Sequence, residues 1–300
     1  MSEKDIEFGF LTLATKNDYL KAIGLALSIR VSNPGVPIAI ACSNKVRPLV
    51  EPYFDYVIEE QAGLRGFIHK VYLDIYSPFK NTVFFDSDVL VFKPALPFVK
   101  AWQDNAYNAV GTYDNNGLSA FGLDRAAMRE KLNKPKFVEI GGAGHAIFFK
   151  PGCTEIFEMA RKISENYKEV SGGARYADED AMNIVMTSMD IAPRSNDLPK
   201  DLHLTCRHLS ARPNTIKMDA RKGLCRFVYN DTGDIWEPCM MHFACNEAPV
   251  TYTWQLYLLF KKFNVSTKGL FTLGAMDFYE LYIKPKLRCV ANVFGLKKRK

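Results

Sequence analysis

Two aspartates interrupt an otherwise apolar segment of this chain. Residues 83–92 read VFFDSDVLVF, with Asp86 and Asp88 among side chains that are typical of a buried strand. Burying a carboxylate without a partner costs several kcal/mol, so the pair needs a cation or an opening in the fold. In open α/β sheets, ligands bind at the carboxyl ends of the strands. The segment therefore predicts a buried strand that ends at a ligand-binding edge of a sheet.

Strand and helix patterns alternate through the rest of the chain. β-rich apolar runs at 8–15, 37–42 and 146–149 are typical of strands, and helical spacing of apolar residues marks 20–31, 68–75, 124–132 and 154–167. Such alternation predicts an α/β fold with a mostly parallel sheet covered on both faces. The pattern is irregular over 194–234 and helical after Pro249. We expect one α/β domain over residues 1–250 and a helical extension over 251–300.

Charge and cysteine content narrow the classes of protein. From Lys284 onward there are seven Lys or Arg and no acid, and elsewhere acidic and basic residues nearly balance. We expect no nucleic-acid partner, because such proteins usually carry a basic face on the folded body. The charged N-terminus and the lack of a long apolar run predict neither a signal peptide nor a membrane span. Seven scattered cysteines favour free thiols and a cytoplasmic location.

The aspartates could share one metal ion. Asp86 and Asp88 are two residues apart, so an extended chain directs both carboxylates to the same side, where they could bind a hard divalent cation. The alternative is a turn in which Asp86 and Ser87 bond their own backbone.

Beyond these residue-level arguments, the sequence resembles a known family. Asp-Ser-Asp after an apolar strand is similar to the DxD motif of GT-A glycosyltransferases, and further segments resemble family 8, which includes glycogenin and bacterial galactosyltransferases. These segments occur in the family's order between residues 8 and 250: residues 12–19 (TLATKNDY), Lys70, residues 178–183 (DEDAMN) and residues 241–243 (MHF). The resemblance implies a Rossmann-like GT-A fold with a mostly parallel mixed sheet. It also implies metal-dependent transfer of a hexosyl group from a nucleotide-sugar, expected to be a UDP-sugar, to an acceptor hydroxyl with retention of configuration.

The resemblance also implies roles for individual residues. Asp86, Asp88 and His242 would bind the metal, and this donor set suits Mn²⁺ or Mg²⁺, with Mn²⁺ the better match to a nitrogen ligand. Asp178 and Asp180 would face the donor sugar and the acceptor. The donor-binding set is expected to comprise Leu13, Thr15, Tyr19, Arg65, Lys70, Asp86, Ser87, Gly144 and His145.

Several of these residues have alternative interpretations. His242 could belong to a zinc site with Cys239 and Cys245, completed by His203, Cys206 or His208, or it could be a core histidine. Lys70 could pair with Asp74 on a helix, and Arg65 could merely cover apolar surface. The acids at 178–180 could simply favour a helix N-terminus, and the glycines at 141–144 could serve a tight turn.

Two positions depart from the family pattern. Cys245 and Ala248 stand where the family commonly has glycine and lysine, so a diphosphate-binding cation must come from elsewhere. His145 stands where a small residue is usual. A non-catalytic relative is one alternative to the enzyme, and a nucleotidyltransferase that makes an activated sugar is another, although residues 12–19 lack the glycine-rich basic loop that such enzymes usually carry.

The C-terminal tail suggests a further contact. Residues 282–300 combine the seven cations with apolar residues such as Tyr282, Leu287 and Phe294, a mixture that suits an anionic membrane surface. Such contact would place the protein on the inner face of a membrane and near a lipid-linked acceptor, although glycan and protein acceptors are equally compatible. The alternative is a solvated terminus.

Overall fold

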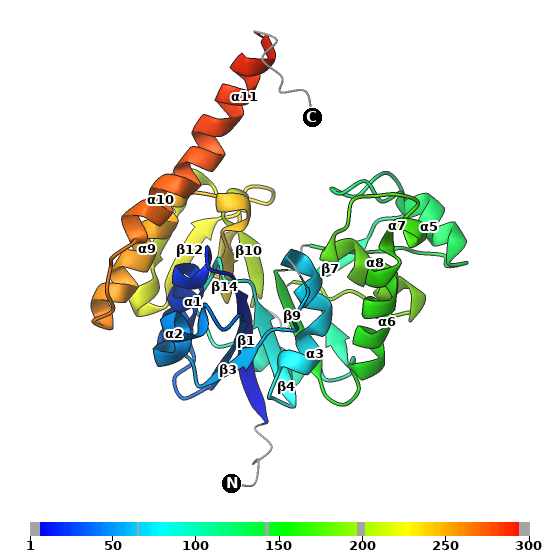
Figure 1. Cartoon of the computed structure of the whole chain (residues 1–300), viewed down its shortest axis with the longest axis horizontal. Coiled ribbons are helices and arrows are strands. Elements are labelled where there is room, and N and C mark those ends of the chain that lie inside the picture. The colour runs from blue at the N-terminus through cyan, green and yellow to red at the C-terminus, as the bar shows by residue number, and fades with distance from the viewer. Residues whose placement is uncertain (1–6, 65, 142–143, 197–201, 294–300) are drawn as a thin grey trace.

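A six-stranded mixed sheet forms the centre of the molecule (Figure 1). The computed structural model describes residues 7–64, 66–141, 144–196 and 202–293. The strand order is β3-β2-β1-β4-β9-β6, with bounds Tyr56–Glu59, Ile38–Cys42, Phe8–Ala14, Asn81–Phe85, His145–Phe149 and Tyr107–Asn108. The first four strands are parallel, whereas β9 runs antiparallel to both β4 and β6. This arrangement confirms the predicted α/β class and the mostly parallel sheet.

Helices cover both faces of this sheet. One face packs on α1, α2, α9 and α10, and the other packs on α3, α6 and α8 (Figure 1). The helices are α1 Tyr19–Ser32, α2 Arg47–Val50, α3 Leu73–Tyr76, α4 Leu96–Ala101, α5 Arg125–Lys131, α6 Thr154–Glu165, α7 Tyr167–Val170, α8 Asp178–Ser188, α9 Pro249–Lys262, α10 Leu270–Phe278 and α11 Lys284–Val293. The shorter strands are β5 Val89–Val91, β7 Gly111–Tyr113, β8 Val138–Ile140, β10 Thr205–Arg207, β11 Lys217–Asp219, β12 Leu224–Val228, β13 Ile235–Trp236 and β14 Met240–His242.

Helix α9 packs closely against α1. A Cβ at Gly24 of α1 would lie 2.1 Å from Leu256 Cδ2 of α9, so only glycine allows this approach. Leu256, Leu259 and Phe260 are fully buried in the same core as α1. Although α9 lies at the predicted boundary near residue 250, it therefore packs as part of the main body. The boundary itself stays a prediction.

The segment predicted as a helix over 68–75 takes a tighter form. It is a 3₁₀-helix over Gly66–Tyr72, followed by the single turn of α3. Ser77 is extended, as the residue before a proline prefers, and this conformation ends the helix. Ile75 is consequently exposed, whereas Tyr76 is buried.

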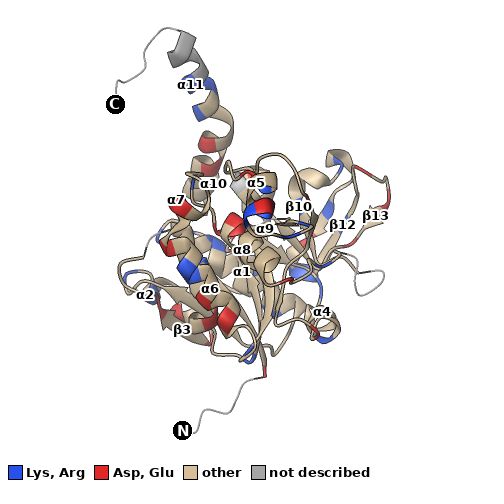
Figure 2. Ribbon diagram, turned by 90° about the vertical axis from the view of Figure 1, so that its right-hand side faces the viewer, with Lys and Arg blue, Asp and Glu red and all other residues tan. Residues whose placement is uncertain are grey.

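The C-terminal helices leave the body of the molecule. Helix α10 continues through one π-helical segment over Tyr279–Ile283 into α11, which projects away from the sheet (Figure 1). Figure 2 shows basic residues on α11, and the last acids before this helix in the sequence are Asp277 and Glu280. The last part of the predicted membrane tail, residues 294–300, lies outside the described residues. Within the described ranges, no helix has both the length and the apolar character needed to cross a membrane.

Candidate functional site

Strand pairing brings His242 to the two aspartates. Asp86 follows the last residue of β4, and its backbone N–H donates to the Gly144 carbonyl at 2.9 Å. The chain turns at this point into β5, where Val89 lies opposite His242 of the antiparallel β14. The imidazole Nε2 of His242 lies 3.1 Å from Asp88 Oδ1 and 3.9 Å from Asp86 Oδ2. One ligand atom from each of the three residues falls within 4.8 Å of the others.

This group fits a divalent cation. Two carboxylate oxygens and one imidazole nitrogen are ligands that Mn²⁺ and Mg²⁺ accept. Gly144 makes room for the group, because a Cβ at this position would lie 2.4 Å from His242 Cε1 and 3.2 Å from Asp86 Oδ2. Gly144, which was predicted to lie near the donor, is therefore a sterically required neighbour of these candidate ligands.

Burial and the neighbouring charges shift the pKa values of all three side chains. Burial raises the pKa of Asp86, against the opposing charge of Lys70. Burial also acts to raise the pKa of Asp88, but the hydrogen bond and charge of His242 outweigh it and lower that pKa. For His242, burial acts to lower the pKa, and the Asp88 and Asp86 carboxylates more than offset it. Two half-buried carboxylates held this close repel each other, which is the electrostatic situation that a bound cation relieves.

Lys70 joins the aspartate loop to helix α8. Its Nζ lies 2.9 Å from Asp86 and 3.1 Å from Asp178 Oδ2, the latter in the first turn of α8. Burial alone would lower the pKa of Lys70, but the two carboxylates outweigh it and raise that pKa. Asp74, the alternative partner suggested by helical spacing, pairs with Arg161 at 2.7 Å. Lys70 and Asp178 thus lie at the predicted site, next to the metal ligands.

Asp180 and His145 make different contacts. The Asp180 carboxylate is fully buried and accepts hydrogen bonds from Ser119 Oγ at 2.8 Å and from the Tyr167 hydroxyl at 3.1 Å. His145 Nε2 accepts from the Val110 backbone N–H at 3.1 Å, and burial lowers the pKa of His145 to about 3. Both side chains therefore support neighbouring segments of the chain, and His145 is a neutral acceptor.

A cavity of about 360 Å³ opens beside Asp86 and Asp88. It lies where the parallel strands β1 and β4 end side by side. Six residues predicted to bind the donor or metal line it, namely Leu13, Thr15, Lys70, Asp86, Ser87 and Asp88. Five further polar residues of the lining were not predicted from the sequence: Asp18, Lys21, Glu60, His69 and Asn246.

Another predicted donor residue is not among those that line this cavity. Tyr19 is half-buried at the start of α1, where it packs against the core on that side of the sheet. Arg65 lies outside the described residues. Of the unpredicted residues, His69 belongs to a hydrogen-bonded pair, with Nδ1 2.8 Å from the Tyr76 hydroxyl.

The zinc alternative finds no support in the described part of the chain, where the group of possible metal ligands at His242 contains Asp86 and Asp88. The cysteine thiols make other contacts: Cys239 Sγ lies 3.2 Å from the Lys93 carbonyl, and Cys206 Sγ lies 3.1 Å from the Arg207 carbonyl. The His203 ring stacks on Trp236.

Comparisons with known proteins support the fold. No family model matches the sequence, and a search of curated proteins gave no match either. The structure is similar to the bifunctional glycosyltransferase WbbM, with a TM-score of 0.54 and 15% identity over 90% of this chain and 51% of that one. It is also similar to the galactosyltransferase LgtC in complex with donor and acceptor sugar analogues, with a TM-score of 0.51 and 15% identity over 84% of this chain and 94% of that one.

These matches confirm the predicted GT-A fold and the resemblance to glycosyltransferases of that fold. The chain spans about half the length of the WbbM structure and nearly all of LgtC. At 15% identity the likeness concerns the fold, so the activity must be argued from the site itself.

Proposed function

We propose that this protein is a metal-dependent glycosyltransferase that moves a hexosyl group from a UDP-sugar to an acceptor hydroxyl, with retention of configuration. The observation that carries the proposal is the position of Asp86, Asp88 and His242. They lie at the carboxyl end of β4, beside a cavity at the strand ends of a GT-A fold. Ligands of open α/β sheets bind at this edge.

Different residues of the site are proposed to contact different parts of the donor. Asp86, Asp88 and His242 would hold Mn²⁺ or Mg²⁺, which when bound supplies positive charge to the leaving diphosphate. Leu13 and Thr15 line the cavity at the end of β1 and are proposed to contact the base and ribose. Ser87 and the Gly144 backbone border the same region. Lys70 is proposed to keep Asp86 in place and to bring its own charge close to the donor.

Of the two aspartates of α8, Asp178 is the better placed to act on the donor sugar, because it contacts Lys70 beside the metal ligands. Asp180 is proposed to act indirectly, since its bonds to Ser119 and Tyr167 fix the segment that precedes α5 against α7 and α8. In this proposal, Asp178 orients the sugar and Asp180 positions the surrounding chain.

The test is a UDP-release assay across a panel of UDP-sugars, with Mn²⁺, with Mg²⁺ and with EDTA. We expect release with at least one UDP-sugar that requires the metal. Pyrophosphate release from a nucleoside triphosphate and a sugar phosphate would favour the nucleotidyltransferase alternative. Tight UDP binding with Mn²⁺ but without release from any sugar in the panel would favour a non-catalytic relative.

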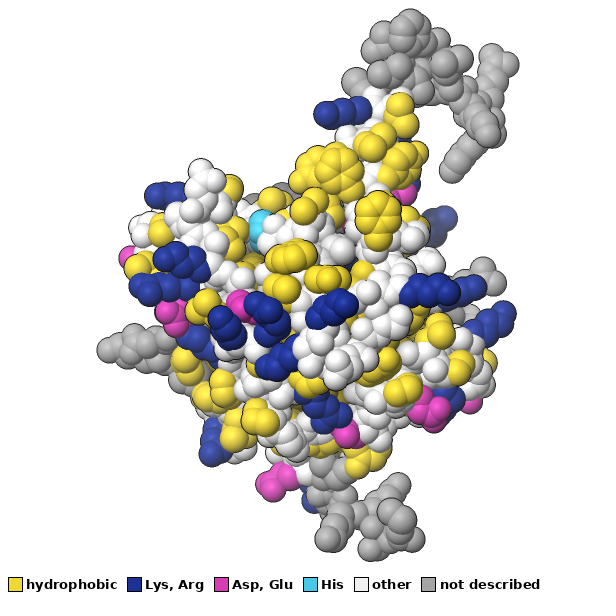
Figure 3. All heavy atoms as spheres, turned by 90° about the vertical axis from the view of Figure 1, so that its left-hand side faces the viewer, with side chains coloured by type: hydrophobic (Ala, Val, Ile, Leu, Met, Phe, Trp, Pro, Cys, Tyr) yellow, Lys and Arg dark blue, Asp and Glu magenta, His cyan; other side chains and the backbone are white. Residues whose placement is uncertain are grey.

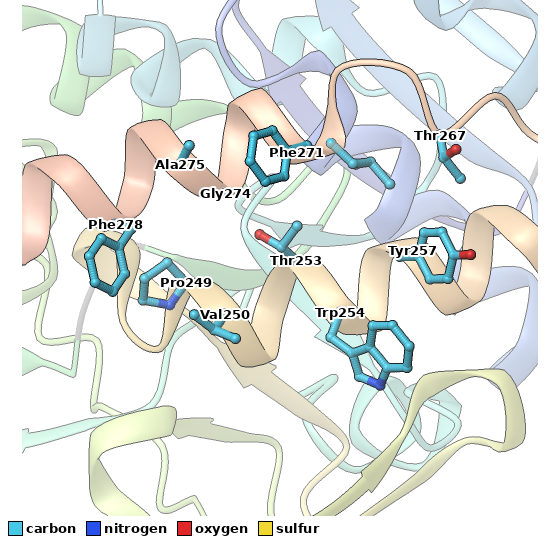
Figure 4. A pocket seen from close by; sticks show the side chains of 11 residues that line it. Pro249, Val250, Thr253, Trp254, Tyr257, Thr267, Phe271, Gly274, Ala275 and Phe278 are labelled. Atoms are coloured by element: carbon cyan, nitrogen blue, oxygen red, sulfur yellow. The ribbon is translucent and has the colours of Figure 1, made fainter.

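An exposed apolar face suggests how the enzyme could reach its acceptor. A groove of about 610 Å³ runs between α9 and α10, and Figure 4 shows Val250 and Trp254 of α9 facing it together with Phe271 and Phe278 of α10. Phe271 is 88% exposed and Val250 70% exposed. Figure 3 shows that hydrophobic side chains continue from this face along the projecting helix, with Lys and Arg beside them.

We propose that this face and α11 rest on an anionic membrane surface. Apolar side chains would enter the headgroup boundary, while Lys261, Lys262, Lys286 and Arg288 would attract anionic lipids. Contiguous exposed apolar surface of this kind marks interaction sites in soluble proteins. A lipid-linked acceptor is therefore proposed over a soluble glycan or a protein.

A further inference from the structure

A second buried lysine lines the donor cavity. Lys21 lies in the first turn of α1 and is only 5% exposed. Its Nζ lies 3.0 Å from Asn246 Oδ1 and 3.1 Å from Asp277 Oδ2 of α10. Unlike a lysine sealed in the core, it shares the cavity wall with Asp86 and Asp88.

We infer that Lys21 is a cationic ligand of the donor diphosphate, in addition to Lys70; this inference rests on the proposed function. An ammonium group has three hydrogen-bond donors, of which Asn246 Oδ1 accepts one, and Asp277 Oδ2 forms an ion pair with Nζ at 3.1 Å. A remaining donor can be directed into the cavity that Lys21 lines. The lysine would thereby supply the positive charge that Ala248 lacks, from a different element of the fold.

The charge balance of the cavity favours this role. Lys70 is engaged by two carboxylates, Asp86 and Asp178. Lys21 has one carboxylate partner, and the amide of Asn246 is neutral. A donor diphosphate adds negative charge beside Asp86 and Asp88, so a second cation on the wall strengthens its binding. Burial acts to raise the pKa of Asp88, and the hydrogen bond and charge of His242 act to lower it. The charge of Lys21 adds a smaller lowering effect, so its electrostatic influence reaches this carboxylate.

The backbone around Asn246 is a second, independent observation. Asn246 has φ 62° and Ala248 has φ 47°, both in the left-handed region. Asparagine tolerates this conformation, whereas alanine at a positive φ is uncommon and strained. The strained turn directly follows the strand that carries His242 and sets Asn246 against Lys21. The hydrogen bond to Asn246 therefore holds the ammonium group of Lys21 at the cavity, in addition to the position that α1 gives it.

The competing explanation is that Lys21 only neutralises Asp277. Removing Lys21 alone would leave a buried carboxylate unpaired and could unfold the protein. The test therefore compares Lys21→Met with the double variant Lys21→Met/Asp277→Asn, in which both charges are gone. Lys217→Met, which removes an exposed lysine from β11, is the matched control for loss of one positive charge.

The measurement is calorimetric titration of UDP into each variant at saturating Mn²⁺, with thermal denaturation as the check on folding. We expect the dissociation constant for UDP to rise about 10-fold or more in Lys21→Met and in the folded double variant, and to stay unchanged in Lys217→Met. Wild-type affinity in the double variant would overturn this inference and leave the proposed function standing. Wild-type protein that binds no UDP with Mn²⁺ would overturn both.

Discussion

The imidazole of His242 lies 3.1 Å from the carboxylate of Asp88, although 154 residues separate them in the chain. The contact follows from backbone pairing, because β14 is antiparallel to β5 and the Phe243 N–H donates to the Asp88 carbonyl at 3.0 Å. Strand β5 begins directly after Asp88 and β14 ends at His242, so the pairing of these strands fixes the geometry of the three side chains before any ion binds. Preorganised ligands of this kind reduce the entropic cost of metal binding.

Gly144→Ala should weaken Mn²⁺ binding about 10-fold or more. The new methyl group would overlap the His242 ring at 2.4 Å and displace it from Asp88. Gly141→Ala is the control, because its Cβ would meet only the Val110 carbonyl, at an ordinary 3.6 Å. The measurement is a Mn²⁺ titration followed by electron paramagnetic resonance of the free ion. Equal affinity in both alanine variants would show that His242 is not a ligand.

Lys70→Met should destabilise the protein by about 3–5 kcal/mol in metal-free buffer, because Asp86 and Asp178 would lose a buried counter-charge. Chemical denaturation measures this change, with the exposed Lys168→Met as control. Mn²⁺ should recover part of the loss by replacing the missing positive charge at Asp86. An unchanged denaturation midpoint would mean that these ion pairs contribute nothing to folding.

Local patterns in the sequence were sufficient to predict the strand before Asp86 and most helices. The helix predicted over 154–167 is α6 at Thr154–Glu165, and the strand predicted over 146–149 is β9. The antiparallel direction of β9 could not be predicted, because the alternation of strands and helices does not give strand direction. The grouping of Asp86, Asp88 and His242 followed from family resemblance rather than from spacing.

Contacts between distant segments account for what the sequence did not reveal. Lys21 lies among the apolar residues of α1 and has no local signal, since its partners Asn246 and Asp277 belong to the C-terminal part of the chain. Asp178 and Asp180 look alike as acids in a first helical turn. Only tertiary packing separates them, with Asp178 against Lys70 and Asp180 against Ser119.

Glu179→Gln should raise the melting temperature more at pH 8 than at pH 5. Burial, reinforced by Glu139, Asp178 and Asp180, raises the pKa of Glu179 to about 7. A folded-state pKa above the unfolded value favours the protonated form, so its contribution to stability is present at low pH and is lost as the pH rises through about 7. Glutamine stays uncharged at both pH values, so the variant does not lose this stability as the pH rises. The exposed Glu158→Gln is the control, and an equal shift at both pH values would contradict the prediction.

Membrane contact should depend on the apolar face. The double variant Trp254→Ser/Phe271→Ser should lose most of its co-sedimentation with vesicles that contain phosphatidylserine, because it removes two exposed apolar side chains from α9 and α10. Leu209→Ser is the control, since Leu209 is 65% exposed elsewhere on the molecule. High salt should also release the wild-type protein. If the wild-type protein does not co-sediment with such vesicles at low salt, this surface is not a membrane contact.

Asp86, Asp88 and His242 are proposed to hold a divalent cation for a nucleoside diphosphate. The most direct test is calorimetric titration of UDP with and without Mn²⁺, in the wild type and in Asp88→Asn, which keeps the shape of the side chain and removes its charge. We expect Mn²⁺ to strengthen UDP binding to the wild type at least about 10-fold and to have little effect on UDP binding to the folded variant. UDP binding that is equally tight without the metal, or an equal Mn²⁺ effect in Asp88→Asn, would contradict it.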